Sequence, residues 1–167
     1  MKTIAVSRFD YSKVRNLTLS ALVIAMYLVV MYLTQGFAFG QYQVRIATAL
    51  YALSALFPFL IVPLGLANLL SNVLMGGLGP LDMLGGAFAG LVTSGLVYRI
   101  HARRLNDWLL AVPILLCPGL LVPIWLSQLI GVPYSVLAIS ITVGQVIPAI
   151  VGVLLVKQLR HKIGGRV

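Results

Sequence analysis

The sequence predicts an all-α integral membrane protein, a compact bundle of six transmembrane helices with both termini in the cytoplasm. Hydrophobic residues make up 60% of its 167 residues and charged residues only 9%, a balance far from that of a water-soluble domain. A membrane-spanning helix needs about 20 mostly apolar residues, so the chain has room for five or six spans. The Lys and Arg residues lie in clusters between apolar stretches, where they indicate topology. We therefore expect a single transmembrane domain over residues 1–167.

Six apolar stretches define the expected spans, after a short cytoplasmic N-terminal segment at 1–16 and ahead of a basic C-terminal tail at 157–167. They run from Leu17 to Leu33, Ile46 to about Phe57, Phe59 to Met75, Leu81 to Tyr98, Trp108 to Ile130 and Tyr134 to Leu159. The second and third stretches are the doubtful pair, because proline lacks an N–H and clashes with the preceding helical turn. They are either one long helix broken at Pro58 and Pro63 or two short helices that meet in a tight turn.

The distribution of cationic residues favours two separate helices. In that arrangement eleven of the twelve Lys and Arg residues lie on the cytoplasmic side, and only Arg45 does not. A fused span would send the later basic clusters outside, against the tendency of short cytoplasmic loops to be positive. Because the clusters flank apolar spans, they indicate topology rather than nucleic-acid binding. We expect a multi-pass protein surrounded by the lipid bilayer, with no nucleic-acid partner.

Polar residues within the apolar stretches are costly in a bilayer and are therefore candidates for function. Arg45 opens the second span, Asp82 opens the fourth, and Asn68 and Asn72 share one face of the third. With Gln145, about 16 Å into the last span, they predict an outward-facing polar pocket. Two other interpretations stay open. Arg45 and Asp82 could pair with each other or stay solvated, and the amides could serve as hydrogen-bond glue between helices.

The chain carries no recognisable set of catalytic or ATP-binding residues. It has no Glu and three scattered Asp, no His and Cys cluster suited to a metal, and no Walker A motif of the form GxxxxGK(S/T). We predict no enzyme activity, no metal and no cofactor in this chain. If it transports a solute actively, a partner must supply the energy.

Two pairs of small residues predict close approach between helices. Ala21 and Ala25 lie one turn apart on the first span, and Gly86 and Gly90 do so on the fourth. A small-xxx-small pattern lets a second helix pack against the backbone. Either pair therefore marks a possible helix contact, although such patterns are frequent in chains this rich in Ala and Gly.

Several motifs in order resemble the queuosine-precursor transporter family, whose members are substrate-binding S-components of energy-coupling factor (ECF) transporters. The motifs are Tyr42-Gln43-Val44-Arg45-Ile46, Gly65-Leu66-Ala67-Asn68-Leu69-Leu70 and Gly76-Gly77-Leu78-Gly79-Pro80-Leu81-Asp82. The resemblance implies a six-helix, ECF S-component-like protein in a prokaryotic plasma membrane, which takes up a vitamin-like molecule. The implied substrate is a small heterocycle, a 7-deazaguanine-type precursor of queuosine. The implied partners are a transmembrane scaffold subunit and two cytoplasmic ATPases, which use the ATP.

The resemblance also assigns roles to individual residues. Arg45, Asn68 and Asp82 match motif positions and would line or brace the substrate site. Their expected neighbours in that site are Asn72, Gln145 and Tyr42. In S-components an AxxxA motif on the first helix contacts the scaffold, and Ala21 and Ala25 occupy that place here.

Two positions depart from the family pattern. The QVRI motif is commonly followed by Ser-Glu, where this chain has Ala47-Thr48, and the last helix often carries Gly-Glu where it has Gly144-Gln145. A cationic aminomethyl precursor would want a carboxylate partner, because an unpaired buried charge costs several kcal/mol. Either Asp82 takes the cation or the substrate is a different or neutral heterocycle. The alternatives are an S-component for another vitamin-like ligand and a non-transporting membrane assembly protein.

Overall fold

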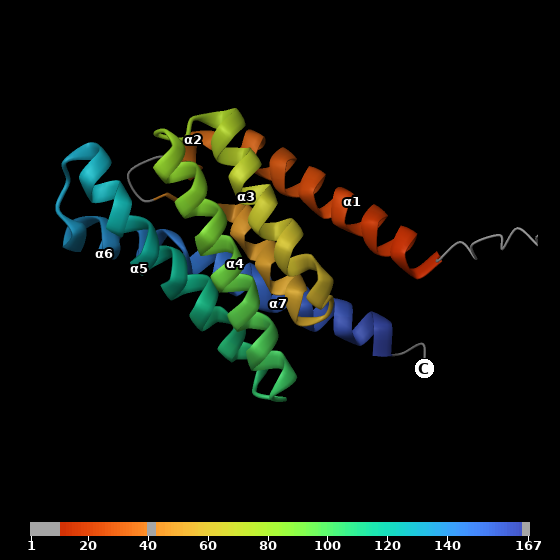
Figure 1. The fold of residues 1–167 in the computed structure, drawn as a ribbon. Coiled ribbons are helices and arrows are strands. Elements are labelled where there is room, and N and C mark those ends of the chain that lie inside the picture. The colour runs from red at the N-terminus through yellow and green to blue at the C-terminus, as the bar shows by residue number, and fades with distance from the viewer. Residues whose placement is uncertain (1–10, 40–42, 165–167) are drawn as a thin grey trace, which may run out of the picture.

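A computed structural model of the chain describes residues 11–39 and 43–164. All regular structure in these two ranges is helical (Figure 1). The elements, with η marking a 3₁₀-helix, are α1 (Tyr11–Leu33), α2 (Gln35–Ala38), η1 (Ile46–Ala55), η2 (Pro58–Leu60), α3 (Ile61–Met75), α4 (Pro80–Ala102), η3 (Asp107–Leu110), α5 (Ala111–Ile130), α6 (Tyr134–Gly144) and α7 (Val146–Gly164).

Among residues 11–39 and 43–164, five helical segments are long and apolar enough to cross a membrane. They are Ser12–Leu33, Pro58–Met75, Pro80–Ala102, Asp107–Ile130 and Tyr134–Lys162. The remaining apolar helix, Ile46–Ala55, has 10 residues, about half the length that an α-helical span needs. A 3₁₀-helix rises about 2.0 Å per residue, so η1 covers about 20 Å. Five predicted spans therefore agree with the structure in length and composition, while the second is shorter than a full span. The count of six spans and the orientation stay predictions.

The short helix η1 is the buried centre of the bundle. Every residue from Ala47 to Ala55 is buried, and α1, α4 and α7 all pack against this helix. Its many alanines permit this close packing, because small side chains let neighbouring backbones approach. On the α7 side, a Cβ on Gly152 would lie 2.9 Å from the carbonyl oxygen of Ala49.

The second and third apolar stretches are separate helices. The chain leaves η1 after Ala55, turns, and enters η2 at Pro58. Asn68 of α3 donates a hydrogen bond back to the Tyr51 hydroxyl of η1 at 2.6 Å. The two helices therefore pack side by side, and the interpretation as two helices joined by a turn is confirmed.

The last apolar stretch is bent at Gln145, between α6 and α7. Pro148 has no N–H to donate to the preceding turn, which interrupts the regular hydrogen bonds of the helix. The backbone N–H of Gln145 is shared between the carbonyl oxygens of Ile141 at 2.9 Å and Thr142 at 3.2 Å. The bend places the buried Gln145 side chain against η1, where it contacts Thr48.

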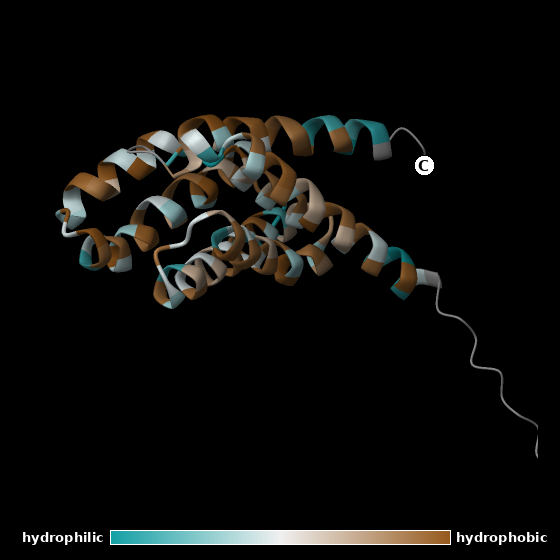
Figure 2. Cartoon of the chain, turned by 90° about the horizontal axis from the view of Figure 1, so that it is seen from above, coloured by the Kyte–Doolittle hydropathy of each residue, from teal (hydrophilic) through white to brown (hydrophobic). Residues whose placement is uncertain are grey.

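The outside of the bundle is apolar, as contact with lipid requires. Leu17, Val62 and Ile139, on three different helices, are each 68–73% exposed. Figure 2 shows hydrophobic residues along the outer faces of the helices, with hydrophilic residues gathered at the start of α1 and the end of α7. Exposed apolar area of this extent suits a bilayer rather than water.

Candidate functional site

The structure brings together five of the six residues predicted to bind substrate. Arg45, Asn68, Asn72, Asp82 and Gln145 are all buried, none more than 7% exposed. Tyr42 lies outside the described residues. None of the five is among the side chains that line the cavity described below. The five form two hydrogen-bonded groups, as buried polar groups usually do: Arg45 with Asn68 and, through Thr48, with Gln145, and Asn72 with Asp82. The two groups are neighbours at Gly86, and together we call them the polar centre.

Arg45 is a buried cation with weak partners. Its Nε donates to the Ala38 carbonyl oxygen at 3.4 Å and its Nη1 to Asn68 Oδ1 at 3.5 Å, both long for such bonds. Its guanidinium carbon lies 4.9 Å from the ring centroid of Phe39. Within the described ranges no carboxylate pairs with Arg45 and its Nη2 has no hydrogen-bond partner. The Arg45 guanidinium therefore has N–H donors that are not used in hydrogen bonds to the described residues.

Asn68 connects Arg45 to a pair of buried tyrosines. Its Nδ2 donates to the Tyr51 hydroxyl at 2.6 Å, and this hydroxyl lies 3.3 Å from that of Tyr27 on α1. The two rings are stacked with centroids 6.0 Å apart. Neither tyrosine is among the site residues predicted from the sequence. Their signal was a hydroxyl in the middle of an apolar span, since a buried Tyr usually finds a hydrogen-bond partner.

Asp82 is bound by neutral donors rather than by Arg45. Its Oδ1 accepts from Trp125 Nε1 at 2.9 Å and its Oδ2 from the Leu78 backbone N–H at 3.3 Å. The suggestion that Asp82 simply pairs with Arg45 is therefore wrong. The carboxylate lies in the first turn of α4, where the helix dipole favours negative charge. Trp125 is also absent from the site residues predicted from the sequence. Its signal was the indole N–H, which needs an acceptor when it is buried.

Asn72 leaves one polar atom without a partner. Its Nδ2 donates to the Asp82 carbonyl oxygen at 3.2 Å, while its buried Oδ1 accepts no hydrogen bond in the described structure. An unpartnered buried acceptor costs about 1–3 kcal/mol. Such an atom is suited to accept a hydrogen bond from a ligand.

Gly86 makes room for the two asparagines. A Cβ at this position would lie 2.5 Å from Asn72 Nδ2 and 2.6 Å from Asn68 Oδ1. One turn further along α4, a Cβ on Gly90 would lie 3.1 Å from the Tyr51 hydroxyl. The small-xxx-small pair of the fourth span therefore packs inside this chain, against the polar centre.

Thr48 and Gln145, the two departures from the family pattern, are hydrogen-bonded to each other. Thr48 Oγ1 lies 2.7 Å from both Gln145 Oε1 and the Arg45 carbonyl oxygen, but its single proton serves one of them. The Arg45 carbonyl already accepts from the Thr48 N–H at 3.0 Å, so we assign the proton to Gln145 Oε1. Gln145 Nε2 donates to the Gln43 carbonyl oxygen at 3.0 Å. The result is a neutral pair in which each amide atom has a partner.

A cavity of about 440 Å³ lies beside the polar centre, within the usual range for small-molecule sites. Its walls are mostly apolar side chains of α5, α6 and the turn between them. Phe39, Gln43 and Leu78 complete the lining, and each contacts a residue of the polar centre behind it. The lining places a few polar atoms among apolar side chains, as in many small-molecule sites. No group of three or more His, Cys, Asp or Glu side chains lies together in the parts that the structure describes.

The predicted contact motif on the first helix is exposed in the part of the chain that the structure describes. Ala21 and Ala25 are exposed, while Val23 and Tyr27 on the other side of α1 are buried. α1 lies at the edge of the bundle, where it packs on α3 and η1 (Figure 1). The small-residue face of α1 is therefore available to another helix.

The chain is similar to one family of known proteins. A family model described as QueT transporter matches residues 17–161, which include η1, the polar centre and the whole described lining of the cavity. No curated protein and no solved structure matches the chain. The resemblance predicted from the ordered motifs is confirmed. The chain belongs to the QueT transporter family, a family of membrane transporters.

Proposed function

We propose that this protein is the substrate-binding subunit of an ECF-type importer for a queuosine precursor or a closely related deazapurine. It would work in a prokaryotic plasma membrane with a transmembrane scaffold subunit and two cytoplasmic ATPases, which use the ATP. The observation that carries the proposal is Arg45, a buried guanidinium that pairs with no carboxylate of residues 11–39 and 43–164 and lies beside a cavity of about 440 Å³. A buried cation without a counter-charge is destabilising, so its retention in a transporter supports a role in binding.

The unused polar atoms near the cavity complement the edge of a guanine-like ring. A lactam presents a carbonyl oxygen, which accepts hydrogen bonds, beside an N–H, which donates one. Arg45 has free donors, and Asn72 Oδ1 is a free acceptor. Both residues adjoin Asn68, Arg45 by a hydrogen bond and Asn72 across the space at Gly86. A deazapurine that reached this point would satisfy both.

The neutral pair of Thr48 and Gln145 favours an uncharged substrate. A cationic aminomethyl group needs a carboxylate in a site of low dielectric constant. Asp82 is the one carboxylate near the cavity among the described residues, and both of its oxygens already accept hydrogen bonds. A neutral 7-substituent avoids this cost, so we favour a neutral deazapurine over the aminomethyl form.

Ligand binding by the purified protein tests the substrate class. We expect 7-cyano-7-deazaguanine, which is neutral, to bind at least about tenfold more tightly than 7-aminomethyl-7-deazaguanine, because burying an unpaired charge costs more than 1.4 kcal/mol. Isothermal titration calorimetry with both compounds, guanine, riboflavin and biotin measures the preference. Tighter binding of the aminomethyl compound would refute the neutral preference. Absence of deazapurine binding at micromolar concentrations would refute the substrate class.

Assembly with a scaffold subunit is expected to depend on the small-residue face of α1. Replacing Ala21 and Ala25 together with Trp should abolish co-purification with the scaffold, because bulky side chains prevent close helix approach. Ligand binding should persist, since both residues point away from the core. The matched control replaces Leu120 and Ile124 with Trp on α5, where both are exposed. Equal co-purification of the two double variants would contradict this role.

A further inference from the structure

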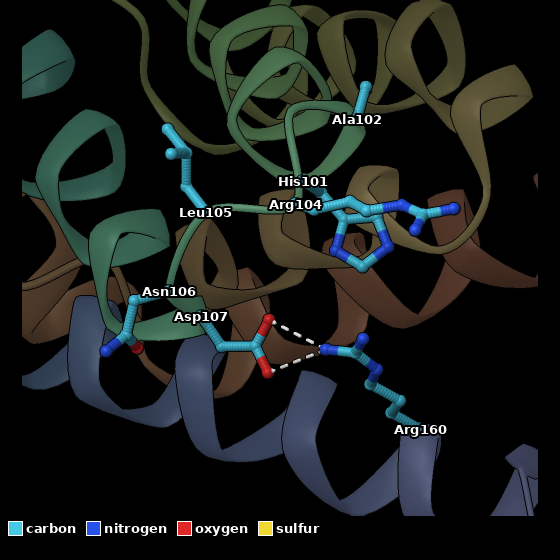
Figure 3. A pocket seen from close by; sticks show the side chains of 7 residues that line it. All are labelled: His101, Ala102, Arg104, Leu105, Asn106, Asp107 and Arg160. Carbon is cyan, nitrogen blue, oxygen red and sulfur yellow. Dashed lines mark hydrogen bonds and ion pairs between the residues drawn. The ribbon is translucent and has the colours of Figure 1, made fainter.

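A second pocket lies at the other end of α4 and α5 from the cavity. It has a volume of about 750 Å³ and is formed where α4 ends, η3 begins and α7 ends. Figure 3 shows the side chains that line it, among them His101, Arg104, Asp107 and Arg160. This pocket shares no residue with the substrate site proposed above.

The pocket carries an excess of positive charge. Asp107 is its one carboxylate, and both carboxylate oxygens accept from the same nitrogen of Arg160, Nη1, at 3.2 and 3.1 Å (Figure 3). The other two guanidinium nitrogens of Arg160 make no hydrogen bond in the described structure, and its side chain is 60% exposed. Arg104 pairs with no described carboxylate. An anion entering the pocket would meet two guanidinium groups and one neutralised carboxylate.

The backbone of Arg104 gives an independent indication of function. Its φ of +54° lies in the left-handed region, where glycine is the favoured residue at the end of a helix. Its N–H donates to the His101 carbonyl oxygen at 2.9 Å and so terminates α4. A side chain kept in a conformation that glycine adopts more easily points to a use for that side chain.

The neighbouring Trp108 indicates where the pocket lies relative to the membrane surface. Trp108 follows Asp107 directly, is 48% exposed, and holds the Lys157 ammonium 4.2 Å from its ring centroid. Tryptophans at the ends of membrane spans lie at the level of the lipid headgroups. We propose that this pocket binds the phosphate of an anionic lipid headgroup, such as phosphatidylglycerol, through charge-assisted hydrogen bonds from Arg104 and Arg160.

Substitution of Arg104 with Gly tests the proposal without disturbing the fold, because glycine suits the left-handed backbone. We expect Arg104→Gly to melt no lower than the wild type and to bind phosphatidylglycerol about tenfold more weakly. Arg103→Gln removes the same charge from an exposed neighbour outside the pocket and should change the affinity by less than about twofold. Native mass spectrometry of the full chain with added phosphatidylglycerol or phosphatidylcholine measures the lipid affinities.

A change of opposite sign provides a second test. Asp107→Asn removes the carboxylate that holds Arg160, so it should tighten phosphatidylglycerol binding severalfold. Equal weakening by Arg104→Gly and Arg103→Gln would show non-specific attraction and overturn the proposal. Equal affinity for phosphatidylcholine would also overturn it. Displacement of the lipid by millimolar inorganic phosphate would assign the pocket to a free anion, and displacement by an acidic peptide would assign it to a protein partner. None of these outcomes depends on the transported substrate.

Discussion

Alanine at position 86 is expected to disrupt the polar centre and to reduce ligand binding by at least about tenfold. The added Cβ would lie 2.5 Å from Asn72 Nδ2 and 2.6 Å from Asn68 Oδ1. Neither amide moves freely, because Asn68 is hydrogen-bonded to Tyr51 and Asn72 to the Asp82 backbone. Overpacking of this kind costs about 1–3 kcal/mol. The melting temperature and the deazapurine affinity of the purified Gly86→Ala variant measure the two effects.

Gly95 provides the matched control on the same helix. A Cβ at Gly95 meets no atom within 4 Å, and alanine is preferred over glycine in a helix by about 1 kcal/mol. Gly95→Ala should therefore melt at or above the wild-type temperature with unchanged binding. If Gly86→Ala has the same melting temperature and deazapurine affinity as Gly95→Ala, Asn68 and Asn72 are not held against Gly86.

Replacement of Arg45 with Met is expected to separate stability from function. Met fills a similar volume without a charge, and removing a buried charge in favour of an apolar side chain is often neutral or stabilising. The hydrogen bonds that are lost, at 3.4 and 3.5 Å, are long and therefore weak. Loss of hydrogen bonds from a charged group to the ligand costs about 1.5–3 kcal/mol, which is roughly 10- to 100-fold in affinity.

Measurement of both properties on the same variants distinguishes a binding role from a structural one. Arg45→Met should keep the wild-type melting temperature and lose deazapurine binding. Arg45→Lys keeps the charge but loses the planar set of donors, so its affinity should fall between those of the wild type and Arg45→Met. A variant that melts well below the wild type but binds normally would show that Arg45 only holds helices together.

The structure changes how we interpret the polar residues that the sequence places within its apolar stretches. The spacing of Asn68 and Asn72 places them on one helix face, and Gly86 lies against both. The sequence could not show that Asp82 bonds to Trp125, 43 residues away. Such a contact depends on how far each helix is rotated and how deep it lies, and neither is defined by spacing along the chain.

The packing around the second predicted span also could not be read from the residues of that span alone. The stretch from Ile46 to Phe57 looks like a short apolar helix by composition. In the structure η1 is surrounded by α1, α4 and α7 and is a 3₁₀-helix of 10 residues. Because protein surrounds η1, the requirement for about 20 residues, which applies to a helix that crosses the bilayer in contact with lipid, does not determine its length.

The amino-acid sequence is enough to identify a helical membrane protein of the QueT transporter family that carries a few polar residues within its apolar stretches. Its apolar stretches must satisfy their backbone groups internally in a bilayer, which leaves helices as the solution for spans of this length. The hydrogen-bond partners of those polar residues depend on the packed bundle. The structure joins Thr48 to Gln145, 97 residues apart. Among the residues it describes, it gives Arg45 no carboxylate partner and Asn72 Oδ1 no hydrogen-bond donor. Hydrogen bonds between helices require distances near 3 Å, and only the packed bundle determines which atoms meet at that distance.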